Sequence, residues 1–209
     1  MTRKFYVIYA MVLLVSTSCT SNQDDSATTS DSEAISQELI ASQKARQLAK
    51  NTKSKLQEIL SSEGFNDIKD ENLIVGSLVD NKFTSASDKL RGVLDLYFKL
   101  KGQQVGYDVD FSESEYEYIN AENNNGYSML ISTGVCKISG EYVSLGLNIT
   151  FKKDNNTTVN RDVIIDEGST LTCTGCRRGC SPRRESNGDG YCTDCQISNS
   201  NCTKTETEG

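Results

Sequence analysis

The chain of 209 residues contains no histidine and no tryptophan. The absence of histidine excludes Ser-His-Asp and Cys-His catalysis and the histidine-based zinc hydrolase motifs, and it leaves carboxylate, lysine or tyrosine chemistry as enzymatic options. The glycines are scattered, and none follows an expected strand in the spacing of a phosphate-binding loop. Apolar residues make up only 36% of the sequence, so we expect a thin core. These absences favour a non-catalytic protein, with a small carboxylate-dependent enzyme as an alternative.

The apolar run near the N-terminus is too short to span a membrane. It covers 11 residues, from Phe5 to Val15, whereas a helix needs about 20 to cross a hydrocarbon core about 30 Å thick. Arg3 and Lys4 precede the run, and small residues follow it up to Ser18. This order is typical of a secretory signal peptide, so we expect residues 1–18 to be a signal and no permanent transmembrane helix to be present.

Cys19 stands directly after these small residues. Together with Ser16, Thr17 and Ser18 it resembles the lipobox of bacterial lipoproteins, although Ser16 replaces the leucine that usually stands three residues before the cysteine. The resemblance implies cleavage before Cys19, a diacylglyceryl anchor on its sulfur and a fatty acyl group such as palmitate on the new N-terminus. Ordinary cleavage after Ser18 with an unmodified Cys19 is the alternative.

Residues 19–31 lack bulky apolar side chains after the cysteine, so they have no reason to fold and are interpreted as a flexible acidic tether. The acidic pair Asp24 and Asp25 resembles the signal by which some Gram-negative bacteria send lipoproteins to the outer leaflet. We therefore expect a cell-envelope protein, an outer membrane lipoprotein that is surface-exposed. A solvated acidic linker without any export role explains the pair equally well.

The charge of the remaining chain argues against one class of partner. Loss of Arg3 and Lys4 leaves 20 basic and 29 acidic residues, a net charge of −9. Duplex nucleic acid needs a basic face, so no nucleic-acid partner is expected. The mature length of 191 residues suits one modest domain with an appendage.

The segment from Ser32 to Ser62 contains neither glycine nor proline. Apolar and small side chains recur along it at steps of mostly three or four, which is helical spacing. Ser32 can cap the start and Gly64 the end. We expect one helix docked on one side of the domain, with a partner-binding or stalk-like role as the alternative. The spaced residues are Ile35, Leu39, Ala45, Ala49, Thr52, Leu56 and Leu60.

Beyond this helix the hydrophobic period changes to two, which is typical of half-buried antiparallel strands. The runs 94–100 and 105–111 alternate across a short polar turn and predict a hairpin, although 90–100 also fits a helix. A further strand pair is expected between 143–151 and 163–165. The sequence therefore predicts an α+β fold, in which the N-terminal helix is followed by an antiparallel β-meander of about six to eight strands.

Three tyrosines, Tyr116, Tyr118 and Tyr127, are candidates for an aromatic face that binds sugar rings. The alternative, which we favour, is that they are ordinary strand residues whose polar tips reach water at a sheet edge.

The C-terminal segment is rich in cysteine. In an oxidising compartment clustered cysteines usually pair, and a segment with so few aliphatic residues has no other means of holding a shape. Three disulfides are therefore predicted, with fifteen pairings open. Cys136 is then left over, most simply as a buried free thiol in a strand, with a bond to the tail or to another chain as the alternative. The disulfide candidates are Cys173, Cys176, Cys180, Cys192, Cys195 and Cys202.

Zinc is the main alternative for this segment. Two C-x2-C pairs fall within tetrathiolate spacing, and each can supply two ligands at about 2.3 Å. Calcium is a weaker alternative at Glu185–Gly190, where oxygen-bearing residues alternate before a glycine, but Gln196 stands where a bidentate carboxylate is required. A turn explains the same stretch. The alternative zinc ligands are Cys173, Cys176, Cys192 and Cys195.

Four arginines, Arg177, Arg178, Arg183 and Arg184, crowd into eight positions of the same segment. Guanidinium groups held in place by disulfides are suited to two-pronged contacts with phosphate or carboxylate, which makes acidic glycan or envelope lipid phosphate a candidate partner. A solvated loop that balances nearby acidic residues is the alternative, and the stronger one.

Taken together, these features predict a lipid-anchored envelope protein that acts as a non-catalytic surface binding or structural module, without an obligatory cofactor. A zinc-binding module is the second hypothesis and a carboxylate-dependent enzyme the third. The expected segments are the signal (1–18), the tether (19–31), the helix and sheet domain (32–168) and the cysteine-rich tail (169–209).

Overall fold

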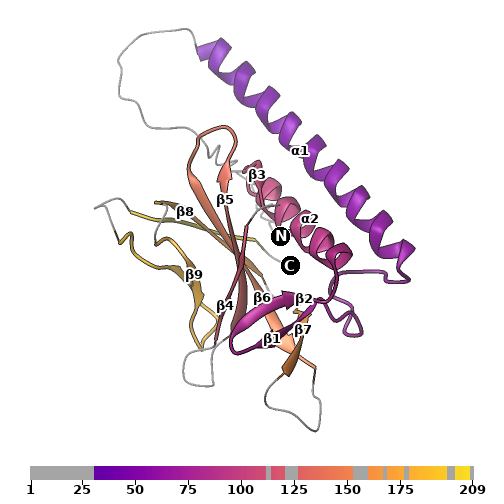
Figure 1. Ribbon diagram of the computed structural model, residues 1–209. Coiled ribbons are helices and arrows are strands. Elements are labelled where there is room, and N and C mark those ends of the chain that lie inside the picture. Colours follow the sequence, from indigo (N-terminus) through magenta and orange to yellow (C-terminus); the bar gives the residue numbers. More distant parts are fainter. Residues whose placement is uncertain are drawn as a thin grey trace, which may run out of the picture.

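The computed structural model describes residues 31–111, 114–120, 127–152, 160–166, 169–176, 179–196 and 201–207, with side chains from residue 39 onward. The predicted signal peptide, the lipid-attachment residue Cys19 and nearly all of the tether lie outside the described residues. Within the described part the fold is α+β, as predicted, with two helices, an antiparallel sheet and a disulfide-bonded C-terminal segment (Figure 1).

The first helix, α1, spans Asp31–Ser62 and confirms the helix predicted from the sequence. Its buried side chains, Thr52, Leu56 and Leu60, are spaced by four residues and form one stripe. The chain leaves the helix through Gly64, whose φ of +82° is the left-handed conformation common just after helix ends.

The second helix, α2, spans Asp88–Gln104, where the alternating pattern predicted a strand of a hairpin. That prediction is wrong, and the helical alternative is right. The side chain of Ser87 caps the helix by accepting a hydrogen bond from the Leu90 backbone N–H at 3.2 Å. Leu96 is only half-buried, whereas the buried positions follow the helical period of 3.6. They are Val93, Leu94, Tyr97, Phe98, Leu100 and Lys101, and the last turn adds Gly102 and Gln103.

Helix α2 packs on a nine-stranded antiparallel sheet, and α1 packs on α2. Its central strand, β6, pairs with β5 along one side and with β7 and β8 along the other. Ile149 pairs with Ile165 and Phe151 with Val163, so the strand pair predicted between these segments is confirmed. The strands are β1 (Gly76–Val79), β2 (Lys82–Ser85), β3 (Val109–Asp110), β4 (Tyr116–Ile119), β5 (Ser128–Cys136), β6 (Tyr142–Phe151), β7 (Asn160–Ile165), β8 (Thr170–Gly175) and β11 (Thr203–Thr207).

A hairpin that the hydrophobic pattern did not indicate joins β1 to β2. Asp80 and Asn81 in its turn have φ of +50° and +60°. Two positive φ angles define the type I′ turn, which matches the twist of the flanking strands. The Asp-Asn pair was thus the local signal for this hairpin.

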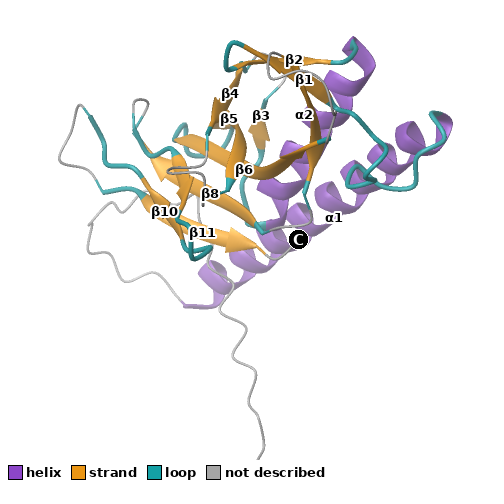
Figure 2. Cartoon of the chain, turned by 90° about the horizontal axis from the view of Figure 1, so that it is seen from below, coloured by secondary structure: helices purple, strands orange, loops and turns teal. Residues whose placement is uncertain are grey.

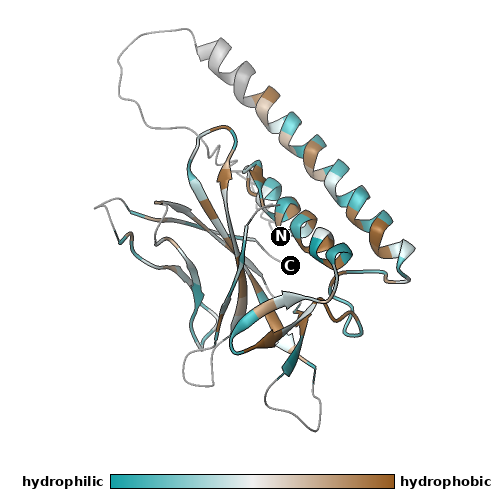
Figure 3. Ribbon diagram, viewed as in Figure 1, coloured by the Kyte–Doolittle hydropathy of each residue, from teal (hydrophilic) through white to brown (hydrophobic). Residues whose placement is uncertain are grey.

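Each face of the sheet carries its own hydrophobic core. Leu130 on β5 faces the helices, while its neighbours Met129 and Ile131 face the other way, because successive strand residues point to opposite faces. The larger core lies between the sheet and the helices; Figure 2 shows the curved sheet with both helices on one side. In Figure 3 hydrophobic residues recur among hydrophilic ones along both helices.

The smaller core lies under a separate two-stranded hairpin, formed by β9 (Pro182–Arg184) and β10 (Gly190–Cys192). A Cβ at Gly146 on β6 would lie 2.9 Å from the Pro182 Cβ, so glycine permits the hairpin to lie directly on the sheet. The hairpin forms a third layer opposite the helices (Figure 1). The segment after the predicted boundary at residue 168 therefore supplies both this layer and two strands of the main sheet.

Candidate functional site: the disulfide-bonded outer layer

Three disulfides hold the outer layer, as the cysteine count predicted. They join Cys173 to Cys192, Cys176 to Cys195 and Cys180 to Cys202, with Cα–Cα separations of 5.8, 5.9 and 5.3 Å. In chain order, the first, second and third cysteines of the tail therefore pair with the fourth, fifth and sixth. The sequence alone did not distinguish this set of disulfides from the other possible sets among the fifteen pairings.

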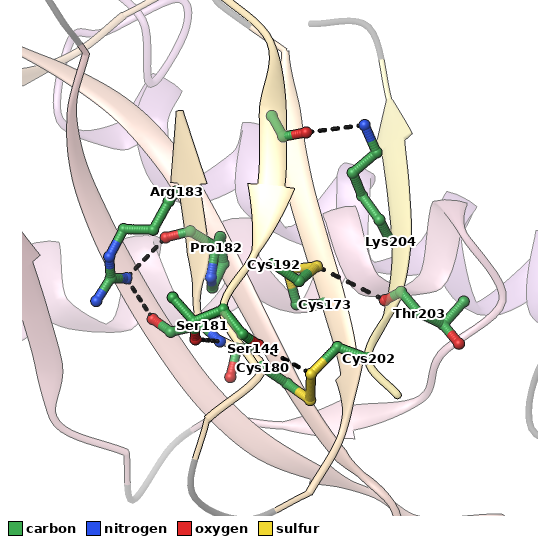
Figure 4. Close-up of a disulfide and its surroundings, with 12 residues drawn as sticks. Ser144, Cys173, Cys180, Ser181, Pro182, Arg183, Cys192, Cys202, Thr203 and Lys204 are labelled. Atoms are coloured by element: carbon green, nitrogen blue, oxygen red, sulfur yellow. Dashed lines mark hydrogen bonds between the residues drawn. A yellow bond between two sulfur atoms is a disulfide. The ribbon is translucent and has the colours of Figure 1, made fainter. Parts of the chain in front are cut away.

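The Cys173–Cys192 bond ties the hairpin to the main sheet (Figure 4). Cys173 lies on β8 with none of its surface exposed, and it belongs to the smaller core together with Leu171 and Ile131. Cys192 lies on β10, at the end of the hairpin that pairs with Pro182. This disulfide is thus both a covalent link between two layers and part of the apolar filling between them.

The other two disulfides lie side by side at the open end of the hairpin. The Sγ atom of Cys180 is 3.4 Å from that of Cys195 and 3.8 Å from that of Cys176, and the Sγ atoms of Cys195 and Cys202 are 3.7 Å apart. A Cβ at Gly179 would lie 2.3 Å from the Asp194 carbonyl oxygen, so only glycine permits the chain to pass there. We call Cys176, Cys180, Cys195 and Cys202 the sulfur cluster.

The predicted zinc ligand set is not the set that the fold brings together. Of its four members, only Cys176 and Cys195 belong to the sulfur cluster, whereas Cys173 and Cys192 form a bond of their own. In the disulfide form these sulfurs are not thiolates, which are the state in which cysteine binds zinc.

Cys136 is disulfide-bonded as well, so the expectation of a free thiol is wrong. It ends β5 with 1% of its surface exposed.

Arg184 is engaged in holding the layer in place. Its guanidinium forms an ion pair with the Glu206 carboxylate on β11 at 2.7 Å and donates to the Ser169 hydroxyl at 2.7 Å and to the Gly188 carbonyl. Only 9% of the residue is exposed. Sequence reasoning missed this role, since nothing local links Arg184 to a glutamate 22 positions later.

Glu206 has a pKa below its ordinary value, first because the Ser169 hydroxyl donates a hydrogen bond to it and then because of Arg184. The arrangement therefore contains a carboxylate that stays charged against a largely buried guanidinium.

Arg183 points to the opposite side of the hairpin. It pairs across the strands with Tyr191, which is 37% exposed, while Arg184 pairs with the buried Gly190. The Arg183 guanidinium donates to the Ser181 hydroxyl and to the Pro182 carbonyl (Figure 4) and lies 3.9 Å from Glu117. Two further arginines singled out in the sequence, Arg177 and Arg178, lie outside the described residues.

The three tyrosines do not form one aromatic face. Tyr116 stacks on Phe98, with ring centroids 5.6 Å apart, and Tyr118 is 9% exposed, so both pack in the larger core. Tyr127 is 41% exposed and lies beside the turn of the β9–β10 hairpin, near Gly188. The exposed aromatic residues of this region are therefore Tyr127 and Tyr191.

A half-buried polar pair lies on the helix side of the sheet, where Tyr116 donates a short hydrogen bond to Asp95. Burial raises the pKa of the Asp95 carboxyl, although the bond from Tyr116 and the charge of Arg91 act in the opposite direction. Burial also raises the pKa of Tyr116. The hydrogen-bond partner of Asp95 is a phenol, and the charge of a second carboxylate, Asp110, contributes to raising the pKa of Asp95.

The stretch considered for calcium forms the turn of the outer hairpin. The Asn187 side-chain amide donates to the Asp189 carboxylate at 2.8 Å, and the Asp189 backbone N–H donates to the Asn187 side-chain oxygen at 2.9 Å. Gly188 between them has φ of +92°. These bonds make a self-contained turn, in which both side chains are already engaged.

No protein-family model, curated protein or solved structure matches this chain. Within the described part of the chain, neither helix is both long and apolar enough to cross a lipid bilayer.

Proposed function

We propose that this protein is a cell-envelope lipoprotein, anchored through Cys19, whose disulfide-bonded outer layer presents a rigid, non-catalytic binding surface. The three tail disulfides are the observation that carries the proposal. Disulfides persist in oxidising compartments and are rare in the cytosol. They therefore support the location that the signal sequence and the lipobox-like residues before Cys19 imply.

The proposed binding surface is the outward side of the β9–β10 hairpin with the neighbouring Tyr127. Tyr191 is 37% and Tyr127 is 41% exposed, and tyrosine rings are of the kind that stack on sugars. Arg183 shares the outward side with its cross-strand partner Tyr191 and is held by Ser181 and Pro182 in one orientation. Tyr127, in contrast, lies at the hairpin turn with its ring 5.9 Å from the Arg184 guanidinium. A guanidinium fixed beside a partly exposed aromatic ring suits an acidic glycan, whose carboxylate or phosphate it can bind in two-pronged fashion in place of Glu117.

The anchor is tested by fractionation and mass spectrometry. The protein extracted from membranes with detergent should begin at Cys19 and carry a diacylglyceryl thioether and an N-acyl group. Cys19→Ser should release the protein from the membrane fraction. Six of the eight cysteines pair within the tail, and a thioether sulfur cannot form a disulfide, so the anchored form requires the bond of Cys136 to be made with a second chain. Recovery of Cys19 crosslinked to Cys136 would contradict the anchor.

The binding surface is tested with immobilised acidic glycans from the envelope. Arg183→Gln and Tyr191→Ala should each weaken binding roughly tenfold, in line with the loss of one charge-assisted hydrogen bond or one aromatic contact. Lys152→Gln, which removes an exposed positive charge elsewhere, is the matched control. Equal binding by all four proteins would refute the surface but leave the anchor standing.

A second candidate, a zinc-binding module, is favoured by the geometry of the sulfur cluster. The three contacts of 3.4, 3.7 and 3.8 Å between sulfurs of different bridges are close to the edge of about 3.8 Å in a tetrahedron with zinc–sulfur bonds of about 2.3 Å. Reduction of both bridges by a dithiol would give four thiolates around one position. The test is the zinc content of native protein purified without reductant: one equivalent supports this function, and none excludes it.

A further inference from the structure

The first half of α1 extends beyond the helix on which it packs. The two helices run antiparallel, since Thr52 in the middle of α1 hydrogen-bonds Gln103 at the end of α2 at 2.8 Å, while Glu63 just after α1 pairs with Lys89 at the start of α2. The residues before Thr52 therefore continue past the end of α2, as Figure 1 shows. This free part of α1 lies at the same end of the molecule at which the chain from Cys19 enters the fold.

Exposed apolar side chains occur on this free part. Leu39 is 58% and Ile40 is 63% exposed, although both are large aliphatic residues. At 3.6 residues per turn they fall outside the stripe of Thr52, Leu56 and Leu60 that packs on α2. Neither residue is needed to attach the helix to its own domain.

Basic side chains accompany the exposed apolar pair. From Leu39 to Gln57 the helix carries five basic residues and no acidic residue, although the whole chain has a net charge of −7. All five are exposed. They are Lys44, Arg46, Lys50, Lys53 and Lys55.

We propose that the outward face of α1, from Leu39 to Lys50, lies on the anionic surface of the membrane that holds the lipid anchor; this inference rests on the proposed anchoring of Cys19. Asp31 stands only 12 positions after Cys19, and a chain of that length reaches at most about 40 Å. The start of α1 therefore stays close to the bilayer whenever the anchor is inserted. Leu39 and Ile40 enter the interface, and the lysine and arginine stems extend so that their charged ends reach lipid phosphates.

The exposed aliphatic pair and the basic side chains of α1 together favour a lipid surface over a protein partner. A helix with exposed aliphatic residues and a basic polar face is the pattern of interfacial membrane helices. An electrostatic contact would add to the membrane affinity that the acylated terminus supplies, because polybasic segments are attracted to anionic lipids. The contact would fix the orientation of the domain, with α1 toward the bilayer.

The absence of tryptophan makes the proposal measurable. In Ile40→Trp the new indole is the only one in the full-length, acylated protein. This variant is reconstituted into vesicles of phosphatidylcholine and phosphatidylglycerol, with or without brominated acyl chains, and tryptophan emission is recorded. Tyr191→Trp, on the outer hairpin, is the matched control for an exposed aromatic position. Flotation of the vesicles reports anchoring independently of the fluorescence.

We expect both variants to float with the vesicles and the emission of Ile40→Trp alone to fall about twofold in brominated lipid, as suits a side chain buried about 5–10 Å into the interface. Changing Lys44, Arg46 and Lys50 together to glutamine should restore most of that emission. If both variants float and neither is quenched, the membrane contact of α1 is refuted while the anchor stands. If neither floats, the anchor itself fails, and the inference fails with it.

Discussion

Removal of the Cys173–Cys192 disulfide should destabilise the whole domain and not only the tail. We consider the double replacement Cys173→Ala and Cys192→Ala, which leaves the other two bridges intact. The bond spans 19 residues, for which the chain-entropy relation gives about 3 kcal/mol. The neighbouring Cys176–Cys195 bridge already shortens the effective loop, which reduces this entropy contribution to about 2.5 kcal/mol.

Packing adds to the entropy term. The Cys173 sulfur lies in the smaller core with no exposed surface, so its loss leaves a small cavity that costs about 1 kcal/mol. The total is about 3 to 4 kcal/mol, which corresponds to a fall in melting temperature of roughly 10 °C for a domain of this size.

Far-ultraviolet circular dichroism during urea unfolding, with no reductant present, measures this loss because it follows the helices and the main sheet together. Ser186→Ala, on the exposed hairpin turn, serves as the control and should leave the midpoint unchanged. An unchanged midpoint in the double variant would show that the outer layer is a loose appendage and would refute the interpretation of the hairpin as a third layer of the fold.

Three further outcomes follow from other contacts. Gly146→Ala should destabilise the fold by about 2 kcal/mol in thermal unfolding, because the new Cβ meets the Met129 Cε atom of the smaller core and the Pro182 Cβ atom of the outer hairpin; an unchanged melting temperature would contradict these contacts. The pKa of Asp95 is raised above 3.8 in the folded protein, so the free energy of unfolding falls as pH rises from the pKa of the unfolded state through that of the folded state. Asp95→Asn should remove this pH dependence from urea titrations across that range. A pH dependence that persists in the variant would exclude Asp95 as its cause. The pKa of Glu206 is lowered, so its contribution to stability is present above pH 4.5 and is lost as pH falls through the folded pKa. Glu206→Gln should cost about 1 to 2 kcal/mol at neutral pH by leaving the Arg184 guanidinium uncompensated, with a smaller cost in acid. An equal cost at both pH values would refute the ion pair's role.

The elements that were predictable from sequence are those with a strong local signal. The first helix has 31 residues from Ser32 to Ser62 without a glycine or proline. In the β6–β7 pair, apolar residues recur at every second position, from 143 to 151 and from 163 to 165. Each of these patterns is compatible with one type of secondary structure. The number of tail disulfides followed from an even cysteine count in a segment that lacks aliphatic residues.

The second helix shows where the hydrophobic pattern is ambiguous. Leu94, Leu96, Phe98 and Leu100 alternate perfectly, yet the helix buries Phe98 and Leu100 and leaves Leu96 half-exposed. A large sheet concave toward the helices supplies the core in which this helix packs, and that environment is a tertiary property that a local pattern does not contain.

The disulfide pairing and the role of Arg184 depend on contacts between distant segments. Cys202 meets Cys180 because β11 pairs with β8 and brings the end of the chain back to the hairpin. The same pairing places Glu206 beside Arg184. Neither contact has a sequence signal, since both are set by strand order in the sheet.

The central claim is that this is an acylated protein of an oxidising compartment with a covalently held outer layer. Peptide mapping under non-reducing conditions, applied to protein extracted from the membrane fraction after thiol alkylation, tests it most directly. We expect an N-terminal peptide that begins with acylated Cys19 and three crosslinked tail peptides, joined as Cys173–Cys192, Cys176–Cys195 and Cys180–Cys202. A cytosolic chain that still begins at Met1, with alkylated tail cysteines, would contradict it.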